Sequence, residues 1–195
     1  MSAPASSPTL RERKKARTRL SIRQEAFRLF DGQGYNNTTI DQIAEAADVS
    51  PRTLYRYFGV KEALLVSDDH TTPIVAAFAN APSELTIVEA YQHAVAEVFG
   101  GLSLEERENA IAGQRMLYQV PEARGLIYSE YIRLIDLLSA AIDKRPDAPS
   151  TEVERRVIAS AIVGVIVAVS HDTPLPEEAL QRAMDILDAK LNPLA

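Results

Sequence analysis

The sequence contains no cysteine, and this absence excludes disulfide bonds, thiolate catalysis and cysteine-ligated zinc. A long hydrophobic run is also missing, because the longest, Val157–Val169, is too short to span a bilayer and contains Ser160 and Gly164. The first ten residues have no apolar core of the kind that a signal peptide needs. From these absences we expect a cytoplasmic protein with no membrane partner.

Sequence motifs that carry catalysis are missing too. The chain has no Gly-rich phosphate loop, no GxSxG motif and no DxDxDG calcium loop. Carboxylate and histidine residues cluster only at Asp68-Asp69-His70 and His171-Asp172. Adjacent side chains of a helix point about 100° apart, so three consecutive residues cannot ligate one metal ion. We therefore predict no catalytic residue, no metal site, no cofactor and no enzyme activity.

Hydrophobic residues make up 46% of the 195-residue chain, a fraction that is ordinary for globular proteins and excludes wholesale disorder. The net charge of −6 hides an asymmetry between the two parts of the chain. Residues 1–61 contain 11 Lys or Arg against 6 Asp or Glu, whereas residues 62–195 contain 10 against 21. An acidic body repels DNA, so the basic segment confines any DNA binding to one end of the protein.

Two short amphipathic patterns meet at a tight turn between Thr39 and Lys61. One apolar stripe of the first pattern is formed by Ile40, Ile43, Ala44 and Ala47, at helical spacing. Ser50 then suits the N-cap of a second helix, and Pro51 suits its first position. The spacing therefore predicts two short helices joined by a turn.

The second of these helices has two chemically different faces. Leu54 and Phe58 share the inward face with Pro51. The opposite face contains hydrogen-bond donors and flat rings, namely Arg52, Thr53, Tyr55 and Arg56. A helix-turn-helix that presents such a face is suited to the major groove of DNA.

This block resembles the DNA-binding domain of the TetR family of bacterial repressors. The residues that carry the resemblance are Gly34-Tyr35, Thr38-Thr39-Ile40, Ile43-Ala44-Glu45-Ala46-Ala47, Val49-Ser50 and Thr53-Leu54-Tyr55-Arg56-Tyr57-Phe58-Gly59-Val60-Lys61. They cover roughly the first third of the chain. The family usually has Gly in the turn where this chain has Asp48. Since Asp tolerates the left-handed conformation better than most residues, we expect the turn to be preserved.

The resemblance implies roles for the residues that match it. Arg52, Thr53 and Tyr55 would face bases, and Arg56 could contact either bases or phosphates. The residues that would hold phosphates are Thr39, Tyr57 and Lys61. We therefore expect an operator in double-stranded DNA as the partner of this segment.

A basic segment, Arg11–Arg19, precedes the helix-turn-helix and contains six basic residues and one acidic residue. One reading is a solvated first turn of a helix. The other is an arm that neutralises phosphates or reaches into the minor groove. Directly ahead of a helix-turn-helix we favour the second reading, with Arg13, Lys14, Lys15 and Arg17 as the contacts.

The remaining pattern is helical throughout, with no strand and no repeat. We predict an all-α fold of about nine helices. Residues 1–10 would form a disordered tail, residues 11–60 the helix-turn-helix domain with its basic arm, and residues 61–195 a ligand-binding and dimerisation domain. Helices are expected to begin near Glu84 and at Pro121, and two capping boxes, Ser103 with Glu106 and Thr151 with Glu154, mark further starts.

A long helix is expected from Lys61, and Pro73 lies within its pattern. Proline removes a backbone donor and clashes with the preceding turn, so we expect a kink or break near Thr71-Thr72. In the TetR family this helix links the two domains and transmits the ligand signal. Pro73 is therefore a candidate hinge, and a structural joint without a signalling role is the alternative.

The resemblance also implies a small-molecule cavity among the helices of the C-terminal domain. The candidate lining residues are Phe78, Tyr91, Phe99, Arg115, Met116, Tyr118, Tyr128 and Tyr131. The alternative is that each tyrosine packs with its hydroxyl at the surface, and that Arg115 pairs with a nearby Glu. The arm LRERKKARTR looks like that of the mycofactocin-regulator branch, whose members respond to acyl-CoA-like ligands, so a fatty acyl compound is the first effector to test.

The helix that contains Val157 is apolar on almost every side. A helix of this kind must be buried all round, which a small body cannot easily achieve alone. We therefore expect a homodimer with Val157, Ala161, Gly164, Ala168, Leu180 and Leu187 at its interface, and the family resemblance implies the same four-helix arrangement. A helix buried within its own subunit is the alternative.

These observations together predict a homodimeric TetR-like transcription regulator. We expect a repressor that binds a near-palindromic operator and is released by its ligand. The alternative is a small-molecule binding protein whose DNA-binding head is not functional.

Overall fold

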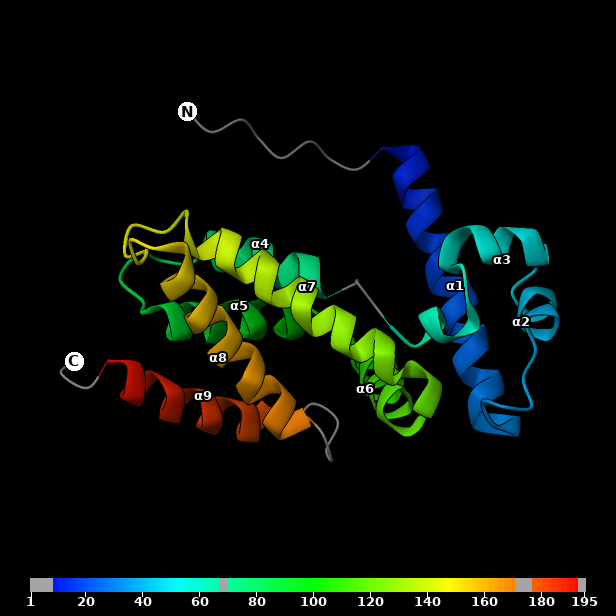
Figure 1. Ribbon diagram of the computed structural model, residues 1–195. Coiled ribbons are helices and arrows are strands. Elements are labelled where there is room, and N and C mark those ends of the chain that lie inside the picture. The colour runs from blue at the N-terminus through cyan, green and yellow to red at the C-terminus, as the bar shows by residue number, and fades with distance from the viewer. Residues whose placement is uncertain (1–8, 67–69, 171–176, 193–195) are drawn as a thin grey trace. The chain divides into compact units, whose positions relative to one another are not determined.

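The computed structural model describes residues 9–66, 70–170 and 177–192. Over these residues it contains helices only, so the predicted all-α fold is confirmed (Figure 1). The helices are α1 (Leu10–Gln33), α2 (Ile40–Ala46), α3 (Pro51–Phe58), the 3-10 helix η1 (Lys61–Leu64), α4 (Thr71–Ala79), α5 (Ile87–Gly100), α6 (Leu104–Gln119), the 3-10 helix η2 (Pro121–Ala123), α7 (Arg124–Ile142), α8 (Glu152–Ser170) and α9 (Glu177–Leu191). The chain divides into two compact units, Met1–Leu65 and Val66–Ala195.

In the first unit α1, α2, α3 and η1 surround a small apolar core. Its buried residues are Ile22, Ala26, Phe27, Phe30, Ile43, Ala44, Leu54, Phe58, Leu64 and Leu65. α2 packs against both α1 and α3, as a helix-turn-helix requires. The predicted inward stripe is therefore confirmed at Ile43, Ala44, Leu54 and Phe58, while Ile40 and Ala47 are half-buried.

The turn between α2 and α3 forms as the sequence predicts. Asp48 adopts the left-handed conformation with φ of 53°, which few residues other than glycine tolerate. Ser50 caps α3 by accepting a hydrogen bond from the backbone N–H of Thr53, and Pro51 occupies the first helical position. Thr39 caps α2, and Gln42 completes a capping box with it.

The basic segment Arg11–Arg19 is helical and lies in the N-terminal part of α1. Its expected phosphate contacts stay a prediction. The helix expected from Lys61 is interrupted, because η1 ends at Leu64 and α4 begins at Thr71. The break expected near Thr71-Thr72 is therefore present, and Pro73 lies in the first turn of α4, where its missing N–H costs nothing.

The second unit has one hydrophobic core that α4, α5, α7, α8 and α9 share. α7 packs against α8 and α4, and α9 packs against α8 and α5 (Figure 1). Buried in this core are Phe78, Val88, Tyr91, Leu138, Ile142, Ile162 and Met184. Arg145 is buried beside it, where it donates to Asp147 and to the backbone carbonyl of Leu85.

The helix starts of the second unit follow local capping signals. Ser103 with Glu106 and Thr151 with Glu154 form the predicted capping boxes. α5 begins at Ile87 and not near Glu84, because Thr86 and Glu89 form a further capping box. Pro121 starts the short η2, and α7 begins only at Arg124.

Candidate nucleic-acid interface

Helix α3 presents a polar face and buries an apolar one. Leu54 and Phe58 are buried in the core of the first unit, whereas Arg52, Tyr55 and Arg56 are exposed. The ring of Tyr55 is 52% exposed, although a tyrosine ring has a large apolar surface to bury. Thr53 is half-buried, and its hydroxyl lies 2.9 Å from that of Ser50. The predicted division of the two faces is therefore confirmed for Leu54 and Phe58, whereas Pro51, expected on the inward face, is exposed.

The residues expected at phosphates lie around this helix. Thr39 is exposed at the start of α2, and Tyr57 is half-buried, with the guanidinium carbon of Arg56 5.4 Å from its ring centroid. The ammonium of Lys61 donates to the backbone carbonyls of Tyr35 at 2.9 Å and Thr38 at 3.0 Å. The ammonium also lies 4.0 Å from the centroid of the Tyr35 ring, so Lys61 is engaged within the first unit. The DNA contacts themselves stay predictions.

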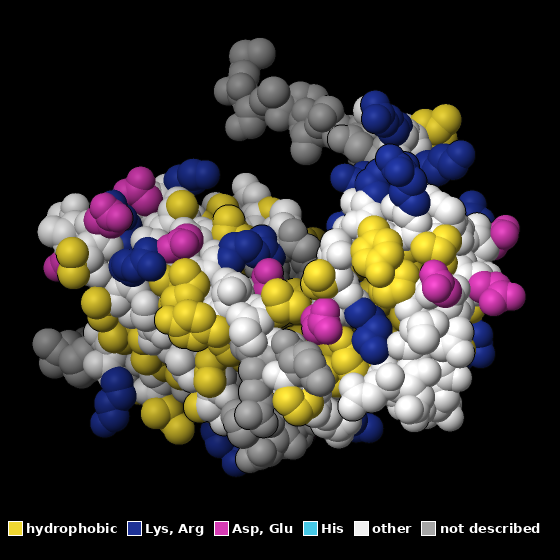
Figure 2. All heavy atoms as spheres, turned by 45° about the vertical axis from the view of Figure 1, so that its right-hand side comes forward, with side chains coloured by type: hydrophobic (Ala, Val, Ile, Leu, Met, Phe, Trp, Pro, Cys, Tyr) yellow, Lys and Arg dark blue, Asp and Glu magenta, His cyan; other side chains and the backbone are white. Residues whose placement is uncertain are grey.

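The basic residues of α1 are solvent-exposed at its N-terminal end. Arg13, Lys14, Lys15 and Arg17 are all exposed. Figure 2 shows Lys and Arg side chains gathered around this end of the first unit. Such a cluster attracts polyanions, and neutralising phosphates with it would release counterions.

Two arginines of α1 have a role that the sequence analysis missed. Arg19 donates to the backbone carbonyl of Tyr57, and Arg23 donates to that of Leu64. In the sequence these two arginines are marked only by lying four residues apart, which places both on the same face of a helix.

The expected ligand residues of the second unit have mixed environments. Phe78 and Tyr91 are buried and meet edge to face at 6.5 Å, and burial raises the pKa of Tyr91 above its ordinary range. Phe99 is half-buried beside the ring of His70, and Met116, Tyr118 and Tyr131 are half-buried too. The hydroxyls of Tyr118 and Tyr131 hydrogen-bond to each other.

Two members of the expected cavity set lie at the surface. Tyr128 is 69% exposed. This exposure fits the alternative prediction, a tyrosine at the surface, better than a residue that lines a cavity. Arg115 is exposed as well. The ligand contacts of all eight residues stay predictions.

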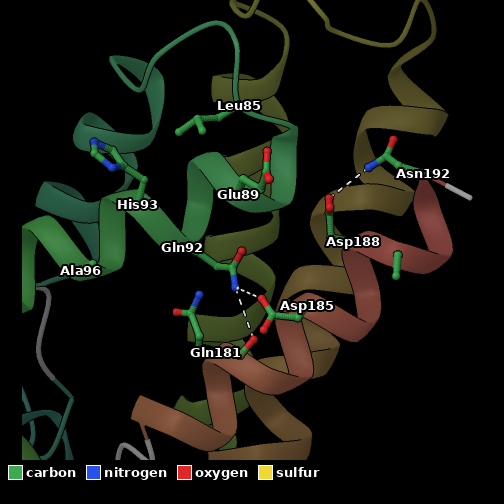
Figure 3. A pocket seen from close by; sticks show the side chains of 10 residues that line it. Leu85, Glu89, Gln92, His93, Ala96, Gln181, Asp185, Asp188 and Asn192 are labelled. Atoms are coloured by element: carbon green, nitrogen blue, oxygen red, sulfur yellow. Dashed lines mark hydrogen bonds between the residues drawn. The ribbon is translucent and has the colours of Figure 1, made fainter. Parts of the chain in front are cut away.

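A groove of about 700 Å³ lies elsewhere, between α5 and α9 (Figure 3). None of the eight expected residues lines it; its lining is Leu85, Glu89, Gln92, His93, Ala96, Gln181, Asp185, Asp188, Ala189 and Asn192. Gln92 of α5 donates across the groove to Asp185 at 2.8 Å and to the backbone carbonyl of Gln181 at 3.3 Å in α9, and Asn192 donates to Asp188 at 3.0 Å at the end of α9. Hydrogen bonds of Gln92 therefore join the two helices in the groove.

The residues expected at a dimer interface divide between two environments. Val157, Gly164 and Ala168 are exposed along one side of α8, and Ala161 is half-buried. Leu180 and Leu187 instead pack against the core of their own subunit, whereas Ile186, which the sequence analysis did not select, is 60% exposed. The opposite side of α8 is buried through Ala159, Ile162 and Val163. One side of α8 is therefore buried in the core of its own subunit, and the side with Val157, Gly164 and Ala168 is an exposed apolar surface.

Neither a metal centre nor a membrane span is found in the described part of the chain. Its residues contain no group of three or more His, Asp or Glu side chains placed to hold an ion. No helix among them combines the length and apolarity that crossing a bilayer requires. The Asp68-Asp69 pair, the His171-Asp172 pair and the first eight residues lie outside the described residues.

Comparisons with known proteins connect this geometry to a family. Residues 22–67 match the profile described as bacterial regulatory proteins of the TetR family, and residues 85–195 match the MftR C-terminal domain. The transcriptional regulator TcmR of Streptomyces glaucescens is 36% identical over 135 residues, which are 65% of this chain and only 57% of TcmR. MftR of Mycobacterium tuberculosis, whose name assigns it to mycofactocin biosynthesis, is 24% identical over 93% of this chain and 95% of its own.

Solved structures share the fold. A TetR-family regulator from Syntrophomonas wolfei has a TM-score of 0.58 at 18% identity, with 92% of this chain and 97% of its own covered. The TetR family repressor AlkX from a Dietzia species, implicated in biodegradation of n-alkanes, has a TM-score of 0.56 at 20% identity, with 89% and 94% covered. At these identities the likeness concerns the architecture alone.

Proposed function

This chain belongs to the TetR family of DNA-binding transcriptional regulators, and from that premise we propose that it is a homodimeric repressor. In this proposal two α3 helices read a near-palindromic operator, and a small-molecule effector in the second unit releases the protein from DNA. The exposed face of α3 is the observation that carries the proposal, because its arginines and tyrosine ring are presented on a helix whose other face is locked into a core.

The chemistry of that face suits base recognition. Arginine can donate two parallel hydrogen bonds to guanine, and such a pair discriminates between bases by about 1–3 kcal/mol. In our proposal Arg52, Thr53 and Tyr55 face base edges, and Arg56 contacts either bases or phosphates. Thr39, Tyr57, Lys61 and the exposed basic residues of α1 hold the phosphates, which position the protein without reading the sequence.

Selection of bound duplexes from a random pool, followed by footprinting, tests the proposal. We expect a near-palindrome with half-site centres about one helical turn apart, roughly 34–36 Å or a little more. The affinity should fall steeply with salt, by a slope of about 0.9 per neutralised phosphate. A protected single half-site would contradict the dimer. No binding at low salt would favour a small-molecule binding protein with a non-functional DNA head.

A fatty acyl compound, such as an acyl-CoA, is the effector that we propose. The match of residues 85–195 to the MftR C-terminal domain supports this class, together with the aromatic residues Phe78, Tyr91, Tyr118 and Tyr131 in the second unit. Native mass spectrometry of the purified protein should detect a co-purified acyl compound, and the same compound should lower the affinity for the selected duplex. CoA without its acyl chain is the control, since it lacks the apolar part that such a cavity would bury.

A second copy of the chain is the partner that we propose for the exposed side of α8. Val157, Gly164 and Ala168 form an apolar stripe with two small residues, which allow a close approach of helices. Ile186 extends the proposed interface to α9. Leu180 and Leu187 of α9 are partly buried and pack against the core of their own subunit.

A further inference from the structure

Arg19 and Arg23 of α1 hold the segment that follows the recognition helix. Nη1 of Arg19 donates to the backbone carbonyl of Tyr57 at 3.4 Å, and its guanidinium carbon lies 5.0 Å from the ring centroid of Phe58. Nε of Arg23 donates to the backbone carbonyl of Leu64 at 3.0 Å. The two arginines thus bind the backbone on either side of the turn between α3 and η1, Arg19 at Tyr57 and Arg23 at Leu64.

Both acceptors are helix-end carbonyls that need an outside partner. Tyr57 lies in the last turn of α3, where the final four carbonyls of a helix have no intrahelical donor. Leu64 is the last residue of η1. A cation at a helix C-terminus is also favoured by the negative end of the helix dipole. Each arginine therefore provides a hydrogen-bond donor for a helix-end carbonyl and a positive charge near the negative end of the helix dipole.

The recognition helix depends on such contacts because it is short. α3 has eight residues, and helices of this length are marginal in water without tertiary packing. It ends at Gly59, whose positive φ of 76° turns the chain sharply toward η1. Burial of Leu54 and Phe58 fixes the inner face of α3, and Arg19 adds a contact from another helix at its C-terminal end.

Arg23 contacts the end of the segment that links α3 to η1. Arg23 is buried, with 9% of its surface exposed, and its guanidinium carbon lies 5.1 Å from the ring centroid of Phe27. A buried charge of this kind is retained only where it is hydrogen-bonded, and the carbonyl of Leu64 supplies an acceptor. Between the two arginines, Lys61 ties the start of η1 to the carbonyls of Tyr35 and Thr38.

We propose that Arg19 and Arg23 are positioning residues for DNA reading, which act through α3 and η1 and do not themselves contact DNA. The inference rests on the proposed role of α3 in operator recognition. It separates Arg19 and Arg23, which contact backbone carbonyls and aromatic rings, from Lys14, Lys15 and Arg17, which are exposed nearer the N-terminus of α1.

The experiment compares Arg19→Gln and Arg19→Lys with Arg17→Gln in the full-length protein. Each variant is titrated against the selected operator and against random duplex DNA at several salt concentrations. Lysine keeps the charge but lacks the planar fork that both donates to a carbonyl and stacks on a ring. A phosphate contact therefore tolerates Arg19→Lys, whereas a positioning contact does not.

We expect both Arg19 variants to weaken operator binding by about tenfold, the loss that one charge-assisted hydrogen bond represents, with little change on random DNA. Their salt slopes should equal that of the wild type. Arg17→Gln should weaken both duplexes alike and reduce the slope by about 0.9. Arg23→Gln should behave as Arg19→Gln does, and helical content measured by circular dichroism identifies any variant that fails to fold.

Three results would overturn the inference. A smaller salt slope in Arg19→Gln that Arg19→Lys restores would make Arg19 a phosphate contact. Equal losses on operator and random DNA would remove the positioning role, and so would wild-type affinity in both Arg19 variants. If the wild-type protein bound no duplex at all, the proposed DNA-binding function itself would be wrong. That result differs from a failure of the positioning role alone, in which the wild type binds the operator and the Arg19 variants bind it equally well.

Discussion

The hydroxyls of Tyr118, near the end of α6, and Tyr131, in α7, hydrogen-bond to each other. Burial is the largest cause that raises the pKa of Tyr131, and the hydrogen bond to Tyr118 is the second. The pair lies on the two helices where the family resemblance places a ligand. The pair therefore connects the two helices, and the pKa of Tyr131 reports how strongly its hydroxyl is shielded from water.

The ionisation of Tyr131 predicts how stability depends on pH. Because the folded state holds this proton more tightly than the unfolded state, the contribution to stability is complete below the unfolded pKa of about 10 and is lost as the pH rises above it. Tyr131→Phe should make the free energy of unfolding fall less steeply above that pH. Tyr128→Phe, at an exposed site, is the control, and equal slopes in the two variants would contradict the assignment.

The N-cap of the recognition helix gives a second prediction. Ser50→Ala removes the oxygen that accepts from the backbone N–H of Thr53, and should destabilise the protein by about 1 kcal/mol. Ser50→Asn keeps an acceptor and should cost much less, since asparagine caps as well as serine does. Denaturant unfolding measures both variants. Equal stability of the two variants would mean that the cap contributes nothing.

Asp48 gives a third prediction because it occupies the left-handed region. Asp48→Gly removes the steric cost of φ at 53° and should leave stability unchanged or raise it. Asp48→Val, a β-branched residue at the same angle, should lower stability by about 1–2 kcal/mol. The difference between the two variants in thermal or urea unfolding measures the cost, and a valine variant as stable as the glycine variant would refute it.

Features set by neighbouring residues were readable from the sequence. The Ser103–Glu106 and Thr151–Glu154 boxes follow from a three-residue spacing, and the left-handed turn follows from the chemistry of Asp48. The predicted start of α5 near Glu84 was wrong, although Thr86 and Glu89 have the same three-residue spacing and form the capping box that begins the helix.

Features that depend on distant residues were not readable. Arg19 and Tyr57 are 38 residues apart, and nothing local marks their contact. Periodicity identified Leu180 and Leu187 as apolar but could not tell whether they face their own core or a partner, and they face the core. Tyr128 shows the same limit, since a tyrosine at helical spacing suits a cavity and a surface equally.

The exposed stripe of α8 gives a fourth prediction. Val157 is 60% exposed, so Val157→Glu should leave the fold of the subunit intact. In a dimer the same carboxylate would be buried without a partner, which is strongly unfavourable. Size-exclusion chromatography with light scattering should therefore show a shift from dimer to monomer. Leu104→Glu, at another exposed apolar site, should remain dimeric, and a dimeric Val157→Glu would place the interface elsewhere.

The central claim is that the outer face of α3 reads DNA sequence, and the affinity of Arg52→Ala for operator and for random duplex tests it most directly. Arg52 is exposed on that face, so its loss should weaken operator binding by about 1–3 kcal/mol and random binding far less. Arg17→Ala, which removes an exposed charge of α1, should weaken both duplexes alike. Equal losses on the two duplexes for Arg52→Ala would contradict the claim.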